Sequence, residues 1–287
     1  MMLIFIIIAL IALVIGTYTD IKTREVPDWI NYGIIFIGLG ARLIFSLVNF
    51  DFTYIIQGLI GFGIFLAIAL IMYYTGQWGG GDSKMLMGLG ALFGFELKFD
   101  SLIFSFFVNV LFVGALYGLI YSIFLAVYNR KNFFKEWKKI FKKKNILMFQ
   151  RIFLIISVIL LLSLFLIGDI IFKILLLVMI LTLLIGFYSF VFIKAVENSC
   201  MFKYVKPAEL TEGDWIAKDI KVDGKYISGP KDLGIEKKKI RKLIQFYKKG
   251  KIKKVLIKVG IPFVPSFLIA FLISLFFGNI IFLFVSI

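Results

Sequence analysis

The sequence contains no histidine and only one cysteine, Cys200, among its 287 residues. Without histidine, the chain can build neither a Ser-His-Asp nor a Cys-His nucleophilic site, and it cannot carry the His-Glu-x-x-His zinc motif. A single cysteine excludes a Cys-x-x-Cys zinc module and an internal disulfide. We therefore expect no metal and no cofactor, and any acid–base chemistry falls to carboxylates, lysines or tyrosines.

Acidic residues are also scarce, because 17 Asp and Glu face 33 Lys and Arg, for a net charge of +16. Hydrophobic residues make up 61% of the chain, and the mean hydropathy is +0.99. Several stretches exceed the roughly 18 apolar residues needed to cross a membrane. We predict an all-α, polytopic integral membrane protein. In a membrane protein, this positive charge indicates how the chain is oriented in the membrane and that it is attracted to lipid surfaces. It is weaker evidence for nucleic-acid binding, and we expect no nucleic-acid partner.

The apolar stretches predict about eight transmembrane helices. The first lacks a basic leader and a small-residue cleavage site, so we interpret it as a retained helix rather than a signal peptide. The predicted segments lie at about 2–19, 30–48, 54–74, 80–95, 101–128, 152–167, 170–193 and 261–286.

The basic residues predict how these segments are oriented. All but three of the 33 Lys and Arg fall on one side of the alternating connections. The positive-inside rule makes that side cytoplasmic and places both termini outside. The exceptions are Arg42, Lys98 and Lys173. We interpret Arg42 as an outer-boundary residue or a partner for another group, with little functional weight.

The connections divide the chain into five parts. The stretch from Arg130 to Asn145 is basic and aromatic, and we expect it to lie on the inner leaflet, near anionic headgroups. Residues 195–260 predict a small α+β cytoplasmic insert with an Asp-Gly hairpin within 220–227 and an amphipathic helix over 235–249. The predicted parts are membrane helices 1–128, a basic loop 129–151, an additional apolar helix pair 152–194, the insert 195–260 and a C-terminal membrane helix 261–287.

Two carboxylates are expected at the same membrane face. Asp20 follows the first span and Asp82 opens the fourth. The chain crosses the membrane once before Asp20 and three times before Asp82, so both residues lie at the same face. Ionisable groups at membrane depth are costly and usually functional. Two carboxylates held close together share one proton, so one can take a proton from water while the other gives one to a carbonyl. This is peptide hydrolysis without histidine or metal.

Three glycines precede the second carboxylate. Gly79, Gly80 and Gly81 are expected to adopt backbone angles barred to other residues, to let another chain approach closely and to let Asp82 move. The structural alternatives are that Asp82 is an ordinary helix N-cap and that Asp20 is an acid at a helix end. The shared face of the two acids favours chemistry.

Both blocks resemble those of the prepilin peptidases, the GxGD intramembrane aspartyl proteases, and most of all the archaeal preflagellin branch. The first block reads TDIKTREVPDW, with Asp20 and Pro27, and the second reads GGGDSKMLMGLGALFG, with Asp82 and Lys84. The later EGDW at 212–215 and GIPFVPSF at 260–267 also resemble that branch. Pro265 resembles part of a Pro-Ala-Leu motif, although a proline at a helix start explains it equally well.

The resemblance implies that Asp20 and Asp82 are the catalytic pair, with Gly79, Gly80, Gly81, Lys84, Pro27 and Pro265 supporting the motifs and the substrate. It implies a six-helix protease core in the plasma membrane, to which residues 130–194 are an insertion. The implied substrates are precursors with class III signal peptides, the prepilins and archaeal preflagellins, cut at the cytoplasmic face between a basic leader and an apolar helix. Glu25 and Asp28 would attract the leader's lysines. Membrane lipids are the other expected partners. Because the cysteine-rich zinc region of bacterial members is missing, we expect cleavage without methylation.

Two other functions fit the same residues. An ion- or proton-coupled transporter would use Asp20 and Asp82 as ion sites beside broken helices, although the halves show no inverted repeat. A non-catalytic scaffold would recruit partners or anionic lipid through its basic loops, and both aspartates would then be dispensable.

Overall fold

The computed structural model describes residues 1–96, 98 and 100–285. The chain is an all-α polytopic membrane protein with a small sheet-containing insert, as the sequence predicts. Its contacts divide it into two compact units, residues 1–120 with 204–287 and residues 121–203. Residues 286–287 of the predicted C-terminal segment lie outside the described part of the chain.

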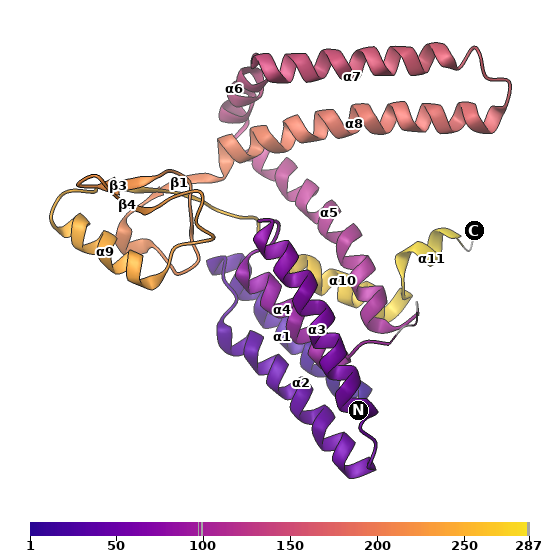
Figure 1. Ribbon diagram of the computed structural model, residues 1–287, viewed down its shortest axis with the longest axis vertical. Coiled ribbons are helices and arrows are strands. Elements are labelled where there is room, and N and C mark those ends of the chain that lie inside the picture. The colour runs from indigo at the N-terminus through magenta and orange to yellow at the C-terminus, as the bar shows by residue number, and fades with distance from the viewer. Residues whose placement is uncertain (97, 99, 286–287) are drawn as a thin grey trace. The chain divides into compact units, whose positions relative to one another are not determined.

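The helices follow the predicted apolar segments closely (Figure 1). Among the described residues, six helices are long and apolar enough to span a membrane. They are α1 (Met2–Thr23), α2 (Asp28–Asn49), α3 (Thr53–Tyr74), α5 (Leu102–Tyr128), α7 (Lys144–Ser163) and α8 (Ile170–Cys200). The other two predicted segments form shorter apolar helices, α4 (Gly80–Phe93) and α10 (Val264–Phe277).

Helix α4 is the centre of the first unit. It contacts α1, α2 and α3, and its residues from Met85 to Phe93 are almost all buried. Glycines allow this close packing, because a Cβ on Gly38 would come within 2.8 Å of the Leu92 backbone and one on Gly90 within 2.7 Å of the Gly61 carbonyl oxygen. Aromatic side chains of α5 and α10, among them Phe106 and Phe267, complete the core.

The predicted C-terminal helix 261–286 is interrupted. Helix α10 ends at Phe277, Gly278 adopts a left-handed φ of 68°, and α11 (Ile280–Val285) begins beyond it. The Asn109 amide explains the break, because it donates to the Gly278 carbonyl and to Ser274 Oγ, each at 2.8 Å, and accepts from the Ile280 N–H at 2.9 Å. The chain leaves helical geometry there because a side chain of α5 replaces the lost helix hydrogen bonds.

The predicted cytoplasmic insert holds two small sheets and one helix. Strand order in the larger sheet is β1-β5-β2, and the other sheet is the β3–β4 hairpin. Asp223 and Gly224, both at positive φ, form the predicted hairpin turn, and the predicted amphipathic helix is α9. The bounds are β1 (Phe202–Val205), a 3-10 turn (Pro207–Glu209), β2 (Trp215–Ile216), β3 (Ile220–Val222), β4 (Lys225–Ser228), α9 (Lys237–Lys248) and β5 (Val255–Lys258).

The second unit holds the predicted insertion. The basic stretch folds as α6 (Arg130–Phe141), and α7 and α8 form a helical hairpin whose apolar side chains are mostly exposed. Three boundaries differ from the predicted ones: α7 begins at Lys144 rather than 152 and ends at Ser163 rather than 167, and α8 continues beyond 193 to Cys200. The extended ends include good helix formers, among them Gln150, Arg151 and Glu197, so helical geometry continues beyond the apolar stretch.

Candidate active site

The end of α1 positions Asp20. The helix ends where Arg24 adopts a left-handed φ of 62° and donates its N–H to the Asp20 carbonyl oxygen at 2.9 Å. Asp20 therefore lies in the last complete turn, where its side chain is 6% exposed. A carboxylate buried this deeply needs partners, and the start of α10 supplies one.

The carboxylate of Asp20 lies at the N-terminus of α10. Its Oδ2 atom accepts the Val264 N–H at 3.0 Å, and a helix N-terminus favours an anion through its unpaired N–H groups and its dipole. Pro265 follows in the first turn, where its missing N–H costs no hydrogen bond. Pro265 thus lies at the start of the helix whose N-terminus binds Asp20. A place at a helix start and a place in a motif near the proposed site are therefore compatible.

Asp82 lies in the first turn of α4. Its Oδ2 atom accepts the Gly79 N–H at 2.9 Å, so Asp82 caps its own helix from the third helical position, with Gly79 rather than Asp82 as the N-cap residue. Helices α1 and α4 contact each other, and the Asp20 and Asp82 carboxylates interact electrostatically. Each carboxylate has one oxygen held by a backbone N–H.

The glycine run contributes close packing rather than unusual backbone angles. Gly79 has φ −70°, and neither Gly80 nor Gly81 is among the positive-φ glycines, so that part of the prediction is wrong. The reason is that α4 already begins at Gly80. Gly81 packs closely within the chain, because a Cβ there would lie 3.2 Å from the Val26 Cβ of the first block, and close approach by another chain stays a prediction.

Trp78 fixes the loop that precedes these glycines. Its ring is 6% exposed and packs against Phe263 and Phe267, with ring centroids 5.7 and 5.3 Å away. The Trp78 side chain therefore joins the loop before Asp82 to the start of α10, which holds Asp20. Sequence reasoning did not identify this residue, although its place next to the glycines was the signal.

Lys84 joins the two sequence blocks. Its ammonium lies 2.6 Å from the Asp28 carboxylate and 5.2 Å from the centroid of the Tyr32 ring. Asp28 opens α2, and Pro27 is the N-cap residue of that helix. Asp28 is thus already paired with a lysine of its own chain, whereas Glu25 is exposed.

Arg42 has a larger structural role than the sequence suggested. It is 3% exposed, and its guanidinium donates to the Leu92 and Tyr54 carbonyl oxygens at 3.0 Å each. These oxygens lie at the end of α4 and the start of α3. Arg42 is thus a partner for other groups, as one of the two sequence interpretations expected, and forms a buried link among three helices. Its place on the side with few basic residues was the available signal.

The sheet-containing insert contacts the end of α3 and the loop that follows it. The Tyr73 hydroxyl donates to the Leu233 carbonyl oxygen at 2.9 Å, and a Cβ on Gly76 would lie 2.9 Å from the Trp215 ring. Glu212 of the EGDW segment interacts electrostatically with Asp28. The Lys237 ammonium lies 3.1 Å from the exposed Glu212 carboxylate and holds the pKa of Glu212 below its usual range.

Comparison with known proteins gives a consistent result over the first half of the chain. Residues 6–127 match the model of the type IV leader peptidase family. The similar proteins include preflagellin peptidases of Methanocaldococcus jannaschii, 36% identical over 86 residues, and of Methanococcus voltae, 40% identical over 85 residues. A third, from Methanococcus maripaludis, is 35% identical over 86 residues.

These matches cover 30% of this chain and about 36% of the length of each relative. No solved structure matches the chain. The matched region contains α1 to α4 and nearly all of α5, and with them Asp20, Asp82 and both sequence blocks. The resemblance found in the sequence is confirmed over residues 6–127, which match the type IV leader peptidase family model.

Proposed function

We propose that this chain is a membrane aspartic endopeptidase that uses Asp20 and Asp82 as its catalytic pair. The observation that carries the proposal is the electrostatic interaction between the two carboxylates, which lie on the contacting helices α1 and α4. The two residues are 62 positions apart in sequence and lie at the ends of these apolar helices. Two carboxylates that share one proton can hydrolyse a peptide bond at a site without histidine.

The first step is the attack of water on the substrate carbonyl. The ionised carboxylate of the pair takes a proton from a water molecule as its oxygen bonds to the carbonyl carbon. The protonated carboxyl gives its proton to the carbonyl oxygen. A neutral tetrahedral diol forms, and the proton has moved from one aspartate to the other.

The second step breaks the carbon–nitrogen bond. The aspartate that gained a proton donates it to the leaving nitrogen, and the other aspartate takes a proton back from a diol hydroxyl. The products are a carboxylic acid and an amine, and the pair returns to its starting protonation state. The backbone N–H groups of Val264 and Gly79 fix the carboxylates throughout, since each holds one oxygen.

The proposed substrates are prepilin-like or preflagellin precursors with class III signal peptides. Support comes from the family match and from three similar proteins that are named preflagellin peptidases. Such a precursor carries a basic leader before an apolar helix, and we place the cut between them at the cytoplasmic face of the plasma membrane. Because Asp28 is paired with Lys84, exposed Glu25 is the better candidate to meet the leader's lysines.

The test is cleavage of such a precursor in membranes that contain Asp20→Asn or Asp82→Asn. Asparagine can still accept the N–H hydrogen bonds but cannot exchange protons, so we expect a loss of at least about a thousandfold in rate with normal protein levels. Asp100→Asn is the matched control, because this acid is exposed in the connection after α4. Near-normal cleavage by either of the first two variants would refute the proposal.

A further inference from the structure

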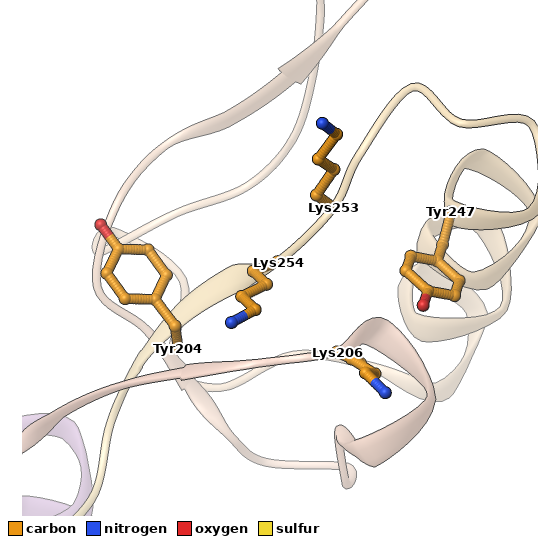
Figure 2. A pocket seen from close by; sticks show the side chains of 5 residues that line it. All are labelled: Tyr204, Lys206, Tyr247, Lys253 and Lys254. Carbon is orange, nitrogen blue, oxygen red and sulfur yellow. The ribbon is translucent and has the colours of Figure 1, made fainter.

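The cytoplasmic insert contains a hollow lined by three lysines and two tyrosines. The hollow measures about 640 Å³ and is lined by Tyr204, Lys206, Tyr247, Lys253 and Lys254. Figure 2 shows that these side chains come from β1 and the residue after it, from the end of α9, and from the approach to β5. Three segments distant in sequence thus contribute to one open, basic surface.

The lysines of the hollow differ from others in the same insert. Lys237, Lys239 and Lys251 each pair with a carboxylate of the insert. In the part of the chain that the structure describes, no ion pair joins Lys206, Lys253 or Lys254 to a carboxylate. The nearby Glu209 carboxylate instead accepts the backbone N–H of Lys206 at 3.2 Å.

Figure 2 also shows the three lysine side chains pointing in different directions. Their flexible stems allow the ammonium groups to turn toward an anion that binds in the hollow. Two tyrosine hydroxyls at the rim supply neutral hydrogen-bond donors.

We propose that this hollow binds a phosphate group, carried by a membrane-lipid headgroup or by a soluble phosphorylated molecule. Phosphate suits lysine, which binds it as a point charge, and it offers several strong acceptor oxygens to ammonium and phenol groups. Lysine and tyrosine are also residues whose apolar bodies and polar tips suit the membrane surface. This site is separate from the proposed peptidase centre and does not depend on it.

The chain keeps this surface within reach of a membrane. Strand β1 begins two residues after the membrane helix α8 ends, and β5 ends six residues before α10 begins. At no more than ~3.6 Å per residue, neither connection lets the strand ends move far from the helices. Basic residues near an anionic surface are attracted to it, so a lipid headgroup is a ready source of the phosphate.

The experiment uses the full chain purified in an uncharged detergent. Binding of two probes is measured by calorimetry: a short-chain phosphatidylglycerol and glycerol phosphate. We expect Lys206→Gln/Lys253→Gln/Lys254→Gln to weaken binding at least tenfold. The matched control is Lys218→Gln/Lys238→Gln/Lys242→Gln, which removes the same charge from exposed positions outside the hollow and is expected to bind as the wild type does.

The two probes separate the sources of the phosphate. Binding of both probes supports a phosphate site open to soluble molecules, and binding of the lipid alone supports a headgroup site. Equal weakening by the two triple variants would contradict the proposal, because it would show a diffuse effect of charge. Failure of the wild type to bind either probe would also overturn it. Circular dichroism and the melting temperature without ligand confirm that each variant is folded.

Discussion

At the scale of single residues, the proposed mechanism gives the two aspartates a structural and a chemical role through the same atoms. Asp20 accepts from the first turn of α10, and Asp82 accepts from the residue that precedes α4. A hydrogen bond gives each carboxylate one preferred orientation. Two carboxylates need such a fixed orientation to share a proton. The structural and functional interpretations of these acids are therefore compatible, and substitution by asparagine separates them.

Arg42 gives the clearest prediction for stability. Arg42→Met removes two charged hydrogen bonds and leaves the Leu92 and Tyr54 carbonyl oxygens buried without this donor. Because a hydrogen bond to a charged group contributes about 1.5–3 kcal/mol, we expect a loss of roughly 3 kcal/mol or more. Thermal unfolding in detergent measures it. Lys98→Met, at a residue whose side chain is 69% exposed, is the control and should change little; equal melting temperatures for the two variants would contradict the role of Arg42.

Asp232 gives a pH-dependent prediction. The Ser228 hydroxyl, at 2.7 Å, and the Lys239 ammonium, at 3.0 Å, hold the pKa of Asp232 below its usual range. A depressed folded-state pKa stabilises the fold above the unfolded value of about 3.9, and this stability is lost as pH falls through the folded pKa. We expect Asp232→Asn to lower local stability by roughly 1 kcal/mol at pH 7 and to have less effect near pH 3.

Hydrogen exchange of peptides covering residues 220–248 measures the Asp232 effect. Asp219→Asn, at an exposed acid of the same insert, is the control and should leave exchange nearly unchanged. A difference between Asp232→Asn and the wild type that stayed constant from pH 7 to pH 3 would show that the charge of Asp232 does not contribute.

At the scale of elements, the catalytic geometry depends on how closely α4 fits its neighbours. Helix α4 has only 14 residues and is packed against α2 and α3 through glycines. Asp82 is part of the first turn of this helix, so any displacement of α4 moves the carboxylate relative to Asp20. The contact between α3 and α4 is therefore a support of the site, although it lies away from the chemistry.

Two glycines of α3 test this contact as a matched pair. A Cβ on Gly61 would collide with the Gly90 carbonyl oxygen and lie 2.6 Å from the Gly94 carbonyl carbon, whereas a Cβ on Gly63 would meet nothing within 4 Å. We expect Gly61→Ala to cost at least about 1–3 kcal/mol by overpacking. Gly63→Ala should be neutral or slightly stabilising, since alanine favours the helix. Thermal unfolding compares the two, and equal stability would contradict the close packing.

The sequence predicted elements well where local signals decide the structure. The Asp223-Gly224 turn and the amphipathic helix α9 are confirmed because turn chemistry and periodicity act over a few residues. The break after α10 was missed because Asn109, which causes it, is 169 residues away from Gly278. The Gly79–Gly81 run was misjudged because composition alone does not show where a helix begins.

At the scale of the whole molecule, the order of apolar segments and the number of long helices followed from hydropathy. The sequence predicted that the two carboxylates lie at the same membrane face, because this depends only on the number of spans that precede each of them. The packing around them was not, because Val264, Trp78 and Arg42 act on partners that are distant in sequence. Sequence patterns report the environment of a residue, and a specific partner appears only when the chain is folded.

The orientation of the chain in the membrane is a prediction that labelling can test. In a Cys200→Ala background, we expect Gly168→Cys, between α7 and α8, to react with an impermeant maleimide on intact cells. Lys231→Cys, in the insert, should react only after permeabilisation. Both positions are exposed, and Cys200→Ala alone is the unlabelled control. The reverse pattern, or labelling of both from one side, would contradict the predicted topology.

The most direct measurement of the central claim compares turnover of a precursor by purified wild type, Asp20→Asn, Asp82→Asn and the double variant in one reconstituted assay. If the two carboxylates share one proton as a unit, each single variant loses at least about a thousandfold and the double variant is no slower than either. Cleavage that survives one substitution, or a double variant that loses the product of both single effects, would contradict the account.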